Sequence, residues 1–180
     1  MEPAPASPVE VVTTRVDTLW LGYVFPLDAS WERKLEAAKY AAGRALRAGR
    51  DPRTGEQLEQ VELVDVEIAG LPFEVRGYGG AGLTYLLEND VMQLGIAPTA
   101  SNGAPVLTVR LLASALWASE PAVLLDAVRR VADELTAPGG ELREAVQRID
   151  VCVDFQGWVP STTDFEKFCC PGAPTATTHE

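Results

Sequence analysis

A succession of short β-forming segments, separated by turn residues, occupies the middle of this 180-residue chain. VELVDVEIAG is followed by LPFEVRGYG, with a turn at Ala69-Gly70, and LTYLLEND is followed by VMQLGIAP, with a turn near Asn89-Asp90. PVLTVRLLASALWA, residues 105–118, is typical of one further long strand or of a strand with an extension. Strands in such close succession predict a sheet that is mainly antiparallel.

A segment with helical periodicity lies on each side of these strands. DASWERKLEAAKYAAGRALRAGRD follows an expected first strand at 16–25, with Ser30 as the expected N-cap and Gly49 at the end. A second helix is expected to start at Ser119 and Pro121, and RIDVCVDFQGW follows it as the last strong strand. The resulting order, β-α-β-β-β-β-β-α-β, predicts an α+β fold in which two helices pack on one face and the last strand inserts beside an earlier one.

Composition is consistent with one domain that has a real core. Hydrophobic residues make up 47% of the chain and charged residues 23%, close to the globular average. We expect residues 1–12 to form a disordered lead, residues 13–159 the α+β domain and residues 160–180 an irregular tail. Because no run of 18 apolar residues occurs, neither a transmembrane helix nor a membrane partner is expected.

Several common catalytic motifs are disfavoured by the sequence. Cys152, Cys169 and Cys170 are too few and wrongly spaced for a disulfide framework or a zinc site, so a reducing cytoplasm is the expected compartment. His179 is the only histidine and lies next to the last residue, which argues against Ser-His-Asp and Cys-His catalysis. Residues 77–82 match GxGxxG, but a strand-like segment follows them, so a loop is favoured over a dinucleotide site.

The positive charge is concentrated in one segment. The chain has a net charge of −11, yet residues 33–53 contain seven bases and two acids. At about 100° per residue, Arg33, Tyr40, Arg44 and Arg47 share the helix face opposite the apolar one. Such a face can follow a phosphate backbone and stack on a base, and the alternative is an ordinary solvated helix face.

Two aspartates interrupt the apolar strand RIDVCVDFQGW. Alternation predicts one face that packs under the helices and one polar face that lies on the open side of the sheet. Asp150 and Asp154 on the polar face are about 13 Å apart at 3.3 Å per residue, too far to hold one ion together. Either aspartate could be a metal ligand if a neighbouring strand supplied the others. The expected apolar face is Ile149, Val151, Val153 and Phe155, and the expected polar face is Arg148, Asp150, Cys152, Asp154 and Gln156.

Three stretches together resemble the N-terminal part of replication initiation proteins of the Rep_trans type, the rolling-circle initiators of plasmids and phages. They are VDTLWLGY (16–23), PVLTVRLLASALWASEPAVLLDAVRRV (105–131) and RIDVCVDFQGWVPSTTDFEKF (148–168), of which the last is the most specific. The resemblance spans residues 13–168. It implies a relative of the HUH endonuclease fold, in which the open face of an antiparallel sheet carries a divalent metal and a tyrosine nucleophile.

In that family the tyrosine attacks a phosphodiester of single-stranded origin DNA, and a metal polarises the scissile phosphate. The family's acidic strand residues correspond to Asp150 and Asp154, so the resemblance implies Mg²⁺ or Mn²⁺ there if the protein is active and no cofactor otherwise. No tyrosine of this chain matches the family's nucleophile, so the catalytic residue is unknown. Because family members run on further, we expect the chain to be a truncated or frameshifted product with an incomplete fold.

Three hypotheses follow. The first is a replication initiator fragment with a DNA-nicking and joining ancestry, in which Asp150 and Asp154 are active-site acids and Arg33, Tyr40, Arg44 and Arg47 contact DNA. The second is a non-catalytic DNA-docking or protein-interaction module of a mobile element. The third is an α+β domain without a retained function. The expected partners are single-stranded or origin DNA, with a replicative helicase or an intact initiator as candidate protein partners.

Overall fold

The structure is a computed structural model that describes residues 10–49, 63–80, 82–98 and 103–156. The chain divides into two compact units, one made of residues 15–152 and one made of both terminal segments. The described part of the terminal unit consists of strand residues 10–14 and 153–156. All helices and the hydrophobic core of the described residues belong to the 15–152 unit.

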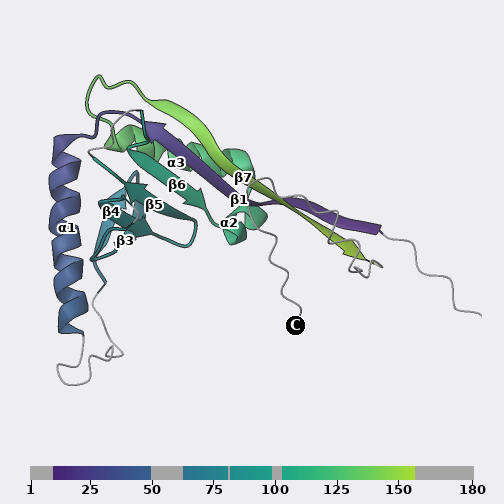
Figure 1. Cartoon of the computed structure of the whole chain (residues 1–180), viewed down its shortest axis with the longest axis horizontal. Helices are drawn as coiled ribbons and strands as arrows, with labels where there is room; N and C mark the ends of the chain where they lie inside the picture. The colour runs from purple at the N-terminus through teal and green to yellow at the C-terminus, as the bar shows by residue number, and fades with distance from the viewer. Residues whose placement is uncertain (1–9, 50–62, 81, 99–102, 157–180) are drawn as a thin grey trace, which may run out of the picture. The chain divides into compact units, whose positions relative to one another are not determined.

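The observed elements follow the expected order, with one addition (Figure 1). Residues 113–118, expected to belong to a long strand or to an extension after it, form a short helix, because the strand ends at Leu111 and the alanine-rich ASALWA follows. The elements are β1 (Glu10–Val24), α1 (Ala29–Ala48), β2 (Asp65–Ile68), β3 (Leu71–Val75), β4 (Tyr85–Glu88), β5 (Met92–Ile96), β6 (Leu107–Leu111), α2 (Ala113–Ala118), α3 (Pro121–Leu135) and β7 (Arg143–Gln156).

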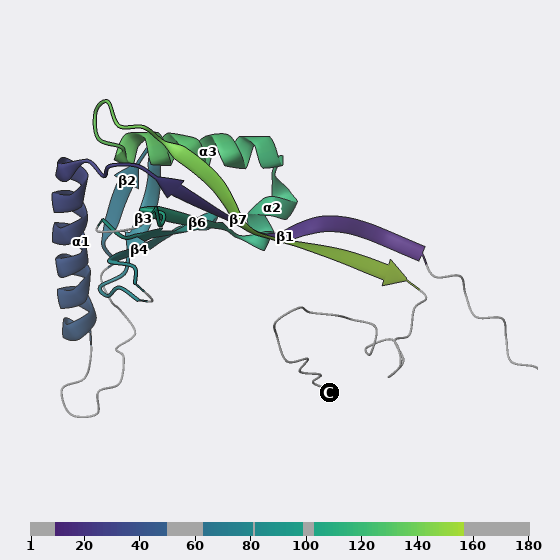
Figure 2. The same cartoon turned by 45° about the horizontal axis from the view of Figure 1, so that its top comes forward.

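The strands form one open antiparallel sheet in the order β2-β3-β4-β5-β6-β1-β7. This confirms the α+β class and the antiparallel sheet. It also confirms that the last strand inserts beside an earlier one, since β7 lies next to β1 (Figure 2). The predicted two-residue turn at Ala69-Gly70 is present, and both residues have positive φ, 53° and 75°. Such values are typical of the tight turns that match the twist of a hairpin.

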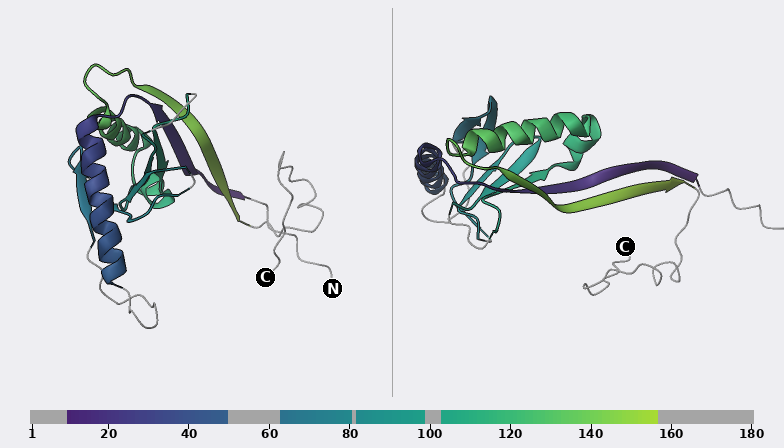
Figure 3. Two further views of the ribbon diagram at one scale, coloured as in Figure 1. Left: turned by 60° about the vertical axis from the view of Figure 1, so that its left-hand side comes forward. Right: turned by 90° about the horizontal axis from the view of Figure 1, so that it is seen from above.

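Both long helices cover the same face of the sheet. Tyr85 and Tyr23 stand at the two ends of one buried row that crosses β4, β5, β6 and β1. The Tyr85 hydroxyl donates to Glu36 of α1, whereas the Tyr23 hydroxyl donates to Glu144, which also accepts from Arg129 of α3. Figure 3 shows α3 lying along this face and α1 beside the β3 and β4 end of the sheet. The apolar face of α3 is buried, and it comprises Leu124, Val128, Val131 and Leu135.

Helix α1 begins two residues earlier than expected. Asp28, rather than Ser30, is the N-cap, and its carboxylate accepts hydrogen bonds from the backbone N–H and the hydroxyl of Ser30. These bonds lower the pKa of Asp28. Both residue types make good caps, and the extended backbone of Asp28 decides between them. The buried face of α1 includes Leu35, Ala38 and Ala42.

The orientation of β7 is fixed by two contacts with its neighbours. Gly22 of β1 lies between buried residues and therefore faces away from the helices, and the side chain of Gln147 occupies the space beside it. Glu144 lies on the helix side, since its carboxylate accepts hydrogen bonds from Arg129 of α3. Even-numbered positions of this part of β7 therefore face the helix side and odd-numbered positions the open side.

The predicted faces of β7 are consequently reversed. Ile149 and Val151 lie on the open side and are 56% and 58% exposed, instead of packing under the helices. Arg148 and Asp150 alternate with them and face the helix side. In the terminal unit, Val153 is also exposed, at 40%. Ile149 and Val151 stay uncovered because they lie on the side of the sheet that faces away from α3.

The glycine-rich segment at 77–82 opens no helix. Gly80 and Leu83 form an isolated antiparallel bridge, and β4 begins at Tyr85. The loop interpretation is therefore confirmed for the residues described there, which exclude Ala81. Across the described ranges, no helix is long and apolar enough to span a membrane.

Candidate nucleic-acid interface

The four residues predicted as a DNA-binding face lie together on the outer side of α1. Because Leu35, Ala38 and Ala42 pack into the core, the opposite side of the helix faces outward. All four side chains are exposed, and Tyr40 is 64% exposed. At 1.5 Å per residue, the row they form is about 21 Å long. We call it the basic face, and its members are Arg33, Tyr40, Arg44 and Arg47.

The two lysines of α1 behave differently from these arginines. Lys34 lies over the ring of Trp31, 4.0 Å from its centroid, and donates to the carbonyl of Glu67 at 3.3 Å. Lys39 lies 5.6 Å from the centroid of the Tyr85 ring. Both lysines therefore fold back onto the protein. By contrast, no arginine of α1 forms an ion pair with another of the described residues.

The charge of α1 becomes more positive toward its C-terminal half. Glu32 and Glu36, the only acids between Ala29 and Ala48, both lie in the first two turns. The twelve residues that follow, AAKYAAGRALRA, contain Lys39, Arg44 and Arg47 and no acid. The strongest attraction for phosphate is therefore expected around Arg44 and Arg47.

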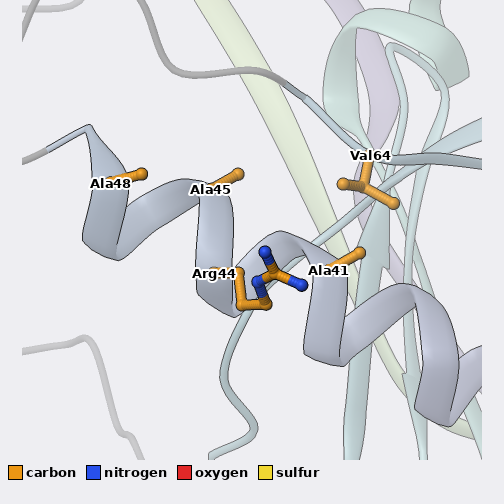
Figure 4. Close-up of a pocket in the computed structure, with 5 residues that line it drawn as sticks. All are labelled: Ala41, Arg44, Ala45, Ala48 and Val64. Carbon is orange, nitrogen blue, oxygen red and sulfur yellow. The ribbon is translucent and has the colours of Figure 1, made fainter.

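A hollow of about 330 Å³ adjoins this half of the helix (Figure 4). Its described walls come from one side of α1 and from Val64, just before β2, and Arg44 is the one charged residue among them. The close-up shows the Arg44 guanidinium beside the helix, near Ala41. A small apolar hollow with one guanidinium suits a flat, partly polar group such as a base. The lining residues are Ala41, Arg44, Ala45, Ala48 and Val64.

This half of α1 is held in place by a close backbone contact that the sequence did not reveal. A Cβ atom added at Gly77 would lie 2.6 Å from the Cα and the N of Gly43. At that distance something must shift, so only glycine allows the loop after β3 to approach α1 this closely. The glycine-rich segment therefore positions the helix turn next to Arg44, a structural role distinct from the phosphate cradle of a dinucleotide site.

A second hollow, of about 460 Å³, lies at the N-terminal end of the basic face. Arg33 lines it together with Glu32, Glu36 and Tyr85. The Tyr85 hydroxyl donates to Glu36 Oε2 at 3.0 Å, and burial followed by this hydrogen bond raises the pKa of Tyr85 to about 12. The two carboxylates make this end of the face less favourable for phosphate than the Arg44 end.

The predicted metal ligands are not brought into a cluster. Asp150 accepts hydrogen bonds from Arg148 Nε, and its Oδ2 lies 2.7 Å from Arg148 Nη2. Asp154 is exposed and belongs to the terminal unit. Within the described ranges, no three His, Cys, Asp or Glu side chains are grouped so that they could hold an ion. The described residues thus do not fit a Mg²⁺ or Mn²⁺ site, and a metal role for either aspartate stays a prediction.

The four tyrosines also differ in their availability. Tyr23 and Tyr85 are buried and donate to glutamates, and burial raises the pKa of both phenols. Tyr40 and Tyr78 are 64% and 56% exposed. Tyr40 is the one that lies among the arginines of the basic face. An exposed ring beside cationic side chains is suited to stacking on a base.

A scan against models of protein families found no match for this chain. Searches of the curated proteins and of the solved structures also found none.

Proposed function

We propose that this chain binds single-stranded DNA through the basic face of α1, as a docking module of a replication-initiator-like protein. The observation that carries the proposal is the row of exposed Arg33, Tyr40, Arg44 and Arg47 on a helix whose other side is packed into the core. A rigid row of this kind offers charge for the phosphates and one ring for stacking.

Single strands suit this surface better than duplex DNA. Phosphate contacts from arginine provide attraction for either form, but stacking needs bases that are free of a partner. Tyr40, 64% exposed, and the apolar hollow beside Arg44 both need an unpaired base to be used. The net charge of −11 repels nucleic acid from the rest of the molecule, so the strand is directed to this face.

The resemblance to Rep_trans initiators supplies the biological setting of the proposal. It suggests origin DNA of a plasmid or phage as the strand that is bound, in the cytoplasm. Nicking by a tyrosine is a separate and further proposal. The described residues favour docking over it, because Asp150 is paired with Arg148 and lies in no cluster of metal ligands within the described ranges.

The proposal is tested by fluorescence anisotropy with a labelled thymidine 20-mer and the full chain. We expect R44E/R47E to lose at least tenfold in affinity, while R130E, a single charge reversal on the exposed side of α3, keeps the wild-type value. Y40A should weaken binding by about 1–3 kcal/mol if one base stacks on the ring. Equal affinities for the wild type, R44E/R47E and R130E would rule out the basic face.

Docking and nicking are separated by incubating labelled single-stranded origin DNA with the chain in Mg²⁺ or Mn²⁺. A denaturing gel then shows whether DNA becomes covalently attached. Binding without an adduct at any metal concentration supports the docking module. An adduct would establish the nicking proposal and would require ligands other than the described ones.

A further inference from the structure

The outer edge of β7 has the features of a strand edge that pairs with another strand. β7 ends the strand order of the sheet, so within the described residues its outer backbone edge has no neighbouring strand. Val146, Ile149 and Val151 are 61%, 56% and 58% exposed on this strand. Natural proteins usually protect such edges, because an uncovered apolar edge invites pairing. The outer edge of β7 is therefore a candidate site for a partner strand.

The charges on β7 favour a second copy of the same strand as the partner. Arg148 and Asp150 flank Ile149 and lie on the same side of the strand. If two copies of β7 pair antiparallel about Ile149, Arg148 of each copy lies directly opposite Asp150 of the other. The strand is thus complementary in charge to itself, and each opposite pair stabilises the pairing across the strands.

The nearest alternative registers of the same pairing are less favourable. A shift of two residues in one direction places Arg148 opposite its own equivalent, and a shift in the other direction places Asp150 opposite its equivalent. Like charges directly opposite each other destabilise a strand pair. A shift of one residue would put the apolar side chains of one copy on the polar side of the other. Among registers within two residues of it, the one centred on Ile149 is therefore the most favourable.

We propose that a second copy of this chain docks on β7, so that the two sheets join into one across a two-fold axis at Ile149. The two Ile149 side chains meet on the open side of the sheet, and Val151 of each copy lies opposite Gln147 of the other. The side chains of Arg148 and Asp150 are 60% and 38% exposed, so both remain accessible to the second copy.

This surface is separate from the proposed DNA-binding face. α1 packs against β2, β3 and β4, and β7 is at the opposite end of the strand order. Pairing through β7 would leave both basic faces of the dimer open. Two linked faces would bind a long strand more tightly than one. The proposed pairing does not depend on DNA binding, because its test measures only the mass of the protein in solution.

Sedimentation equilibrium of the full chain tests the pairing. The wild type should show a concentration-dependent mass that approaches twice the 19.4 kDa of one chain. R148D and D150R should each shift the protein to monomer, because each places like charges opposite one another. The double variant R148D/D150R should dimerise again. An equimolar mixture of the two single variants should also form dimers, since one then presents only acids and the other only bases.

R130D on α3 is the matched control and should dimerise like the wild type. Circular dichroism checks that each variant keeps its fold. A wild type that stays monomeric to the highest measurable concentration overturns the proposal. So do dimers of undiminished strength in both single variants, or a mixture of the single variants that remains monomeric.

Discussion

The Tyr23 hydroxyl in β1 donates a hydrogen bond to Glu144 Oε2 in β7 at 3.2 Å. Arg129 of α3 donates to the same oxygen through Nε at 3.0 Å. One carboxylate thus ties the last strand both to its neighbour in the sheet and to the helix that covers the sheet. The buried phenol would otherwise lack a partner, and the cost of such a group is larger than the gain from a satisfied one.

Replacing Tyr23 by phenylalanine should lower the free energy of unfolding by about 1 kcal/mol, because one hydrogen bond is lost while Glu144 keeps Arg129. Urea unfolding should show a lower midpoint with an unchanged slope. Tyr78→Phe, at a residue that is 56% exposed, is the control and should have no measurable effect. An unchanged midpoint in Tyr23→Phe would show that the bond contributes nothing.

The same carboxylate makes stability depend on pH. The hydrogen bond from Arg129, and then that from Tyr23, hold the pKa of Glu144 below its ordinary value despite partial burial. An acid with a depressed pKa stabilises the fold above its unfolded value, about 4.3, and this contribution fades as pH falls toward the folded value. Urea midpoints should therefore separate wild type from Glu144→Gln at pH 6 and converge toward pH 3. A difference between the midpoints that stays constant over this pH range would contradict the stabilising role of the charged Glu144 carboxylate.

The contact between Gly77 and Gly43 makes a prediction about backbone packing. Gly77→Ala should lower the free energy of unfolding by about 1–3 kcal/mol, because the new Cβ would meet the backbone of α1. Gly80→Ala is the matched control three residues along the same loop, since a Cβ there meets nothing within 4 Å. Thermal unfolding compares the two variants. Equal losses of stability would mean that the close approach of the loop to α1 does not require glycine at position 77.

The turn between β2 and β3 offers a stabilising change. Ala69 has φ of 53°, a conformation that costs an ordinary residue about 1–2 kcal/mol and that asparagine tolerates better. Ala69→Asn should raise Tm by about 2–4 °C, the shift that 1 kcal/mol gives in a chain of this size. In the wild type the backbone N–H of Ala69 donates to Glu134 Oε2 at 2.6 Å, and the substitution leaves this donor in place. A lower Tm in Ala69→Asn would contradict the claim that the positive φ of Ala69 destabilises the turn.

The sequence was sufficient for features that depend on local pattern. The turn at Ala69-Gly70 and the outward face of α1 follow from residues close together in the chain, as does the buried face of α3. The N-cap of α1 was misplaced by two residues because Asp28 and Ser30 are both good caps, and the backbone conformation selects Asp28. The helix at 113–118 was missed because no helix breaker or strong strand signal marks the change after Leu111.

Features that depend on distant partners could not be predicted. An alternating strand such as β7 has the same pattern whichever face is buried, and the contacts of Gln147 with Gly22 and of Glu144 with Arg129 decide its orientation. The hollow beside Arg44 needs Val64, twenty residues further along the chain. Its geometry arises only when β2 is placed against α1.

The salt dependence of binding to a labelled thymidine 20-mer tests the central claim, that the basic face of α1 holds single-stranded DNA. Each phosphate contact contributes about −0.7 to the slope of log K against log salt, so three arginines predict a slope of about −2 for the wild type. R44E/R47E should bring this slope close to that of a single contact, and R130E should leave it unchanged. Absence of binding by the wild type, or the same slope in the wild type and R44E/R47E, would contradict the claim.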